Sequence, residues 1–129
     1  MPTQYDPRYL QGIAYFNDGL FFEAHDAWEA VWMQCEDESR KFYQGLIQAA
    51  VCLYHFGRRN TRGARKLFFS SHHYLASYQP WHLGIDVSRL LGEMERCLAD
   101  VAASDDPIPT AELDRALVPR IHFCDTCES

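Results

Sequence analysis

Apolar residues recur every three to four positions along most of the chain, which is the spacing of one face of an amphipathic helix. This pattern predicts five helices, over about residues 7–16, 20–34, 40–56, 61–78 and 87–101. No segment alternates apolar and polar residues in the way that a half-buried strand does. We therefore expect an all-α protein, a compact bundle of about five helices built from antiparallel helical hairpins.

Capping and turn residues mark the ends of these segments. Asp6 before Pro7 is typical of an N-cap followed by the first helical position. Asn60 and Asp86 are the expected N-caps of the fourth and fifth helices. Gly45 lies inside the third and most apolar helix, where glycine costs about 1 kcal/mol relative to alanine. A close crossing with another helix would explain it.

The last quarter of the chain has a different character. Three prolines exclude a long helix after residue 104: Pro107, Pro109 and Pro119. Residues 110–117 can form a short one. We therefore divide the chain into a helical bundle domain, residues 1–103, and an irregular C-terminal arm, residues 104–129, that either packs on the bundle or frays.

Composition and charge narrow the class of protein. The chain has 129 residues, of which 47% are hydrophobic, and this favours one globular domain. A net charge of −6 disfavours nucleic acid and anionic membranes as partners. No apolar run reaches the roughly 18 residues of a membrane span, and no signal peptide is visible. An odd cysteine number favours reduced thiols in a soluble, cytoplasmic protein: Cys35, Cys52, Cys97, Cys124 and Cys127.

The second predicted helix carries an imidazole and a carboxylate one turn apart. At 100° per residue, His25 and Glu29 fall in the middle of a face made of aromatic and apolar side chains: Phe21, Phe22, Trp28, Trp32 and Met33. We expect both to be buried and hydrogen-bonded, so that removing Glu29 costs about 3 kcal/mol. A ligand site, a metal site, an acid/base pair and a purely structural pair all remain open.

The third predicted helix carries a stripe of neutral polar side chains, namely Gln44, Gln48 and His55. Amides and an imidazole suit a half-buried groove that orients a ligand or a partner helix, although an ordinary surface stripe is the more common explanation. If the second and third helices pack together, His25, Glu29 and His55 can converge as a metal-binding set. The contiguous HExxH motif is absent, and we assign no metal site.

Five basic residues gather around the predicted start of the fourth helix: Arg58, Arg59, Arg62, Arg65 and Lys66. Helix N-termini attract anions, so this cluster, with the capping Asn60, is a candidate site for an anionic ligand or an acidic partner. A solvated helix start is the alternative. The single CxxC motif, Cys124 to Cys127, is half of a zinc site, and a frayed tail explains it as well.

Two sequence blocks resemble the signature of a known family. The first comprises residues 16–19, 22–29 and 32 (FNDG, FEAHDAWE and W), and the second comprises residues 44–50, 54–55 and 60–64 (QGLIQAA, YH and NTRGA). They are similar to the domain of unknown function 309 family, whose members are compact helical bundles. Asp26 departs from the pattern, which has glutamate there. The resemblance implies signature positions without roles: Glu23, His25, Glu29, Trp32, Gln44, Gln48, His55 and Asn60.

Three functional interpretations remain, and we favour the first. It is a non-enzymatic module that binds a small ligand or a protein partner through Glu23, His25, Glu29, Trp32, Gln44, Gln48 and His55. The second is an enzyme, a hydrolase with or without a metal, that uses His25 and Glu29. The third is a phosphate- or RNA-associated protein that binds anions through Arg58, Arg59, Asn60 and Arg62. The sequence identifies no cofactor and no oligomeric state.

Overall fold

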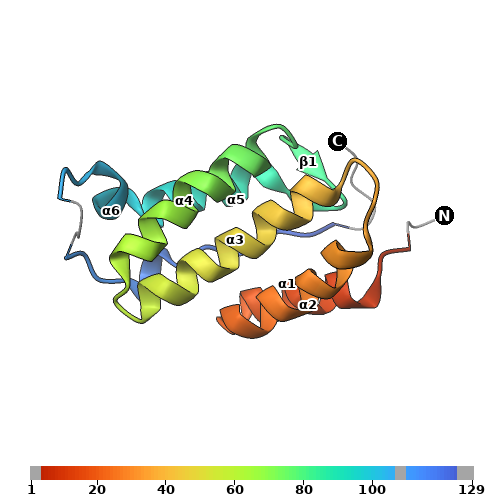
Figure 1. Cartoon of the computed structure of the whole chain (residues 1–129), viewed down its shortest axis with the longest axis horizontal. Coiled ribbons are helices and arrows are strands. Elements are labelled where there is room, and N and C mark those ends of the chain that lie inside the picture. Colours follow the sequence, from red (N-terminus) through yellow and green to blue (C-terminus); the bar gives the residue numbers. More distant parts are fainter. Residues whose placement is uncertain (1–3, 107–109, 125–129) are drawn as a thin grey trace.

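The computed structural model describes residues 4–106 and 110–124. Within these ranges it contains six α-helices: α1 Pro7–Asn17, α2 Phe21–Gln34, α3 Arg40–Gly57, α4 Thr61–Ala76, α5 Val87–Cys97 and α6 Ala99–Ala103. Figure 1 shows α3 running lengthwise through the molecule, with α4 on one side and the α1–α2 hairpin on the other. The predicted all-α class is confirmed.

The predicted caps explain where the helices begin. The Asp6 carboxylate accepts a hydrogen bond from the Arg8 amide at 2.8 Å. The Asn60 side chain accepts one from the Gly63 amide at 3.0 Å, and Asp86 does the same for Arg89 at 3.0 Å. Each cap satisfies a backbone donor that has no partner within its own helix.

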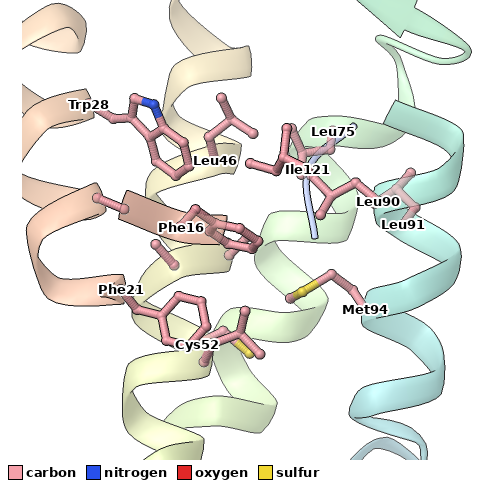
Figure 2. Packing of buried hydrophobic residues seen from close by; sticks show 14 of the residues in the cluster. Phe16, Phe21, Trp28, Leu46, Cys52, Leu75, Leu90, Leu91, Met94 and Ile121 are labelled. Atoms are coloured by element: carbon pink, nitrogen blue, oxygen red, sulfur yellow. The ribbon is translucent and has the colours of Figure 1, made fainter. Parts of the chain in front are cut away.

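The core forms where α3 meets its neighbours. Trp28 of α2 is fully buried, and its indole N–H donates to the Tyr9 carbonyl of α1 at 3.1 Å. Figure 2 shows Leu46 of α3 between Trp28 and the α4 residue Leu75. A Cβ atom on Gly45 would lie 2.7 Å from the Leu75 side chain. The glycine therefore permits the close crossing of α3 and α4 that the sequence predicts.

Three details differ from the predicted helices. A small antiparallel hairpin, β1 Trp81–His82 and β2 Ile85–Asp86, replaces the expected loop. Its turn residues Leu83 and Gly84 have φ values of 46° and 82°, and a leucine at positive φ is not a turn signal that sequence reveals. The fifth helix is divided at Leu98 into α5 and α6, and residues 110–117 form only a 3-10 helix, η1 Arg115–Leu117.

The described part of the arm packs on the bundle. In Figure 1 this blue segment runs lengthwise across the molecule, and Figure 2 shows Ile121 beside Leu75 and Leu90. The Asn17 side chain holds the arm by donating to the Ile121 carbonyl at 3.0 Å and accepting from its amide at 2.7 Å. Pro107, Pro109 and Cys127 lie outside the described residues.

Two expectations from composition can be compared with the structure. Cys35, Cys52 and Cys97 are free thiols, but Cys124 is disulfide-bonded, so the prediction of reduced cysteines throughout is wrong. A count of cysteines does not detect which thiols lie close together in space. Among the described helices, none is both long enough and apolar enough to cross a membrane.

Candidate functional site

The predicted pair on α2 forms, but at the edge of the buried face. His25 Nε2 lies 3.1 Å from Glu29 Oε2, and His25 Nδ1 lies 3.2 Å from the Phe22 carbonyl oxygen. The side chains are 21% and 47% exposed, so the expected burial of Glu29 is wrong. The reason is the rotation of α2 about its axis, which leaves His25 and Glu29 at the side of the buried face. Four other α2 residues face the core: Phe21, Ala24, Trp28 and Val31.

The aromatic residues of α2 do not share one face. Phe21 and Trp28 enter the core, whereas Phe22 is 49% exposed and Met33 is exposed as well. Trp32 is half-buried, and the Arg40 guanidinium covers its ring, with Cζ 4.1 Å from the ring centroid. The indole Nε1 of Trp32 is buried and has no hydrogen-bond partner among the described residues. The expected aromatic pocket around the pair is therefore divided between core and surface.

The polar stripe of α3 is half-buried, which is the less common of the two arrangements that its composition allowed, and it does not converge with the α2 pair. His55 Nδ1 lies 3.3 Å from the Asn60 amide nitrogen, near the start of α4. Gln44 and Gln48 are half-buried, and Gln48 Oε1 lacks a partner in the described chain. No three His, Cys, Asp or Glu side chains within residues 4–106 and 110–124 are grouped to hold a metal ion. His25, Glu29 and His55, which the sequence allowed to converge, therefore do not form a metal-binding group in the described chain.

The basic residues around the start of α4 make separate contacts. The Arg58 guanidinium lies over the Tyr54 ring at 5.3 Å and donates to its hydroxyl at 3.1 Å. Arg59 lies 3.7 Å from the Glu112 carboxylate, and Arg62 is exposed. Asn60 Oδ1 already caps the helix by accepting from the Gly63 amide. An anion site made by the whole cluster stays a prediction.

A cavity of about 360 Å³ lies where the start of α2, the end of α3 and the arm meet. We call it the α2–arm cavity. Its wall is mainly apolar, and the bundle and the arm both contribute to it: Leu20, Phe21, Phe22, Leu53, Leu113 and Val118. Sequence reasoning missed this cavity because the arm residues have no helical period and lie far along the chain from α2.

Three charged side chains line the α2–arm cavity: Glu23, Arg58 and Arg115. Among them, Glu23 and Arg58 were candidates from the sequence. The Phe22 ring connects the cavity to the α2 pair, since it lies 5.6 Å from Tyr54 and 5.4 Å from His25. The structure therefore places Glu23, from the predicted ligand-binding set, and Arg58, from the predicted anion-binding set, at the wall of this cavity.

Comparison with known proteins finds a family model and a relative that are similar to part of the chain. A family model described as a domain of unknown function (DUF309) matches residues 9–67, from α1 into α4. The uncharacterized protein YpuF of Bacillus subtilis (strain 168) is 40% identical over 81 residues, which covers 58% of this chain and 45% of YpuF. The chain thus spans less than half the length of this relative. Through residues 9–67, the chain is similar to the family described as a domain of unknown function, DUF309.

Proposed function

We propose that this protein is a non-enzymatic module that binds a small, largely apolar molecule in the α2–arm cavity. The observation that carries the proposal is the cavity itself, because about 360 Å³ lies within the range of ordinary small-molecule sites. Leu20 and Phe22 at its wall are 44% and 49% exposed. A ligand in the cavity would remove this apolar surface from water, which is favourable at about 25 cal/mol per Å².

The contacts of the α2 pair favour binding over catalysis. Both ring nitrogens of His25 face oxygen atoms of the protein, Nε2 toward Glu29 and Nδ1 toward the Phe22 carbonyl. A general base must offer a nitrogen within hydrogen-bond reach of a substrate proton. We therefore assign the pair a positioning role, in which His25 fixes the first turns of α2 and the Phe22 ring beside the cavity.

A cavity-filling variant tests the proposal. We expect octan-1-ol and octanoate, an uncharged and a charged probe of the same chain length, to shift amide resonances of residues 19–23 and 113–118 in a saturable way. Leu113→Trp fills the cavity and should abolish this binding. Leu117→Trp is the matched control, because Leu117 belongs to the same arm but does not line the cavity. If neither probe binds, or if both bind equally to Leu113→Trp, the proposal is wrong.

A further inference from the structure

We infer that the ligand of the α2–arm cavity carries an anionic head group, and that a carboxylate on an apolar chain is the class it takes. This inference rests on the proposed function. It is based on the three charged side chains at the cavity and on the partners that each of them has. The apolar chain would contact the wall formed by Leu53, Leu113 and Val118, and the head group would face the arginines.

Arg58 is held in place beside the cavity. Its guanidinium lies over the Tyr54 ring at 5.3 Å, and one of its N–H groups donates to the Tyr54 hydroxyl at 3.1 Å. A guanidinium has five N–H donors, so most of its donors are not used by this contact. The ring contact limits the motion of a long side chain, which reduces the entropy that is lost when a carboxylate binds.

Arg115 lines the same cavity from the arm, in the 3-10 helix η1. Its side chain makes no ion pair with a carboxylate anywhere in residues 4–106 and 110–124. Two arginines line this mainly apolar cavity, and neither forms an ion pair with a carboxylate of the described chain. A carboxylate has two oxygens that match the planar fork of arginine donors, and it binds them more strongly than an uncharged group such as a hydroxyl does.

The negative charge of Glu23 opposes the binding of an anion in the cavity and limits the preference for one. Its carboxylate lines the cavity in the first turn of α2 and forms no ion pair with either arginine in the described structure. The three charges together amount to +1, which favours an anion over a cation. One net positive charge at an exposed rim gives only a modest preference for an anionic over a cationic head group. The head group therefore determines which ligands are preferred, and contact with the apolar wall supplies most of the affinity.

The neighbouring basic residues do not share this role. Arg59 is directed to Glu112, and Arg62 does not line the cavity. The cavity therefore separates the basic cluster into one arginine that faces a ligand and others that do not. This distinction provides a matched control, because Arg58→Gln and Arg62→Gln change the net charge of the protein equally.

The experiment compares octanoate, octan-1-ol and octylamine by calorimetric titration at low salt. We expect octanoate to bind most tightly and octylamine most weakly. The double variant Arg58→Gln with Arg115→Gln should weaken octanoate binding by about tenfold and leave octan-1-ol unchanged. Glu23→Gln should strengthen octanoate binding by a few-fold, and Arg62→Gln should have no effect. Circular dichroism of each variant verifies that the helices remain folded.

The outcomes separate the two proposals. Octan-1-ol binding as tightly as octanoate, or octanoate binding that is unchanged in the double arginine variant, overturns the anionic class but leaves the cavity as an apolar ligand site. An equal loss in Arg62→Gln also overturns it, because the effect would then come from overall charge. Failure of all three probes to bind overturns the proposed function and this inference together.

Discussion

Replacing Gly45 by alanine places a methyl group at the crossing of α3 and α4, where there is no room for it. A Cβ atom there would lie 2.7 Å from Leu75 Cγ, 2.8 Å from Leu75 Cδ2 and 3.1 Å from Tyr74 Cβ. Leu75 is fully buried and cannot move into solvent. The variant must therefore separate the two helices or force Leu75 out of its preferred rotamer.

Two opposing effects determine the magnitude. Overpacking a well-packed core costs about 1–3 kcal/mol, and the short distances to a fully buried side chain indicate the upper part of this range. Alanine also stabilises a helix interior by about 1 kcal/mol relative to glycine. We expect Gly45→Ala to lower the free energy of unfolding by about 1–2 kcal/mol. Gly92→Ala on α5 is the control, because its nearest neighbour is Arg96 Nη1 at 3.9 Å.

Urea unfolding followed by circular dichroism at 222 nm measures both variants. In Gly92→Ala there is no overpacking, and only the higher helix propensity of alanine acts, so the free energy of unfolding should rise by up to about 1 kcal/mol. The two variants should then differ by about 2–3 kcal/mol, or by roughly 10 °C in Tm for a chain of this size. Equal stability of Gly45→Ala and Gly92→Ala would show that α3 and α4 do not approach each other as closely as described.

Three further perturbations address the pair, the arm and the hairpin. Glu29→Ala should lower the free energy of unfolding by at most about 1 kcal/mol, since the Glu29 side chain is 47% exposed, and a loss near 3 kcal/mol in urea unfolding would contradict this. Asn17→Ala should cost about 1–3 kcal/mol and speed amide exchange at Ile121, whereas unchanged exchange would rule out the anchor. Burial lowers the pKa of His82 from 6.5, so the unfolded chain binds a proton that the folded one resists. The free energy of unfolding should thus fall as the pH drops below about 6.5, and a His82→Gln variant with the same pH dependence would refute the reasoning.

Helix positions were predictable because their signals are local. Asp6, Asn60 and Asp86 each cap a helix through a side chain within three residues of the amide that it binds. Gly45 was informative for a related reason, since a glycine in an apolar helix interior is costly without a close neighbour. Such features need only short-range geometry, and a single sequence contains that information.

The candidate site was less predictable because it depends on small rotations and on distant contacts. The rotation of α2 about its own axis decides whether Glu29 is buried or, as observed, 47% exposed. His55 and Glu29 lie on stripes that helical spacing alone allows to meet, yet His55 contacts Asn60 instead. The α2–arm cavity requires Arg115 and Val118 to lie beside α2, and no periodic pattern in the arm predicts that contact.

The outer wall of the cavity depends on how the arm is attached after it. Arg120 donates its amide to Glu93 Oε1 at 3.0 Å, next to the Asn17 contacts with Ile121. Burial opposes the ionisation of Glu93, but hydrogen bonds from Arg120 and Arg89 outweigh it and lower the pKa of that carboxyl. Detachment of the arm breaks the hydrogen bond from the Arg120 amide to this carboxylate and the two bonds between Asn17 and Ile121. Each such bond contributes about 1 kcal/mol, so detachment is disfavoured. The bundle therefore holds the segment that carries Arg115, and the cavity is preorganised by contacts of arm residues that lie outside the segment that the family model matches.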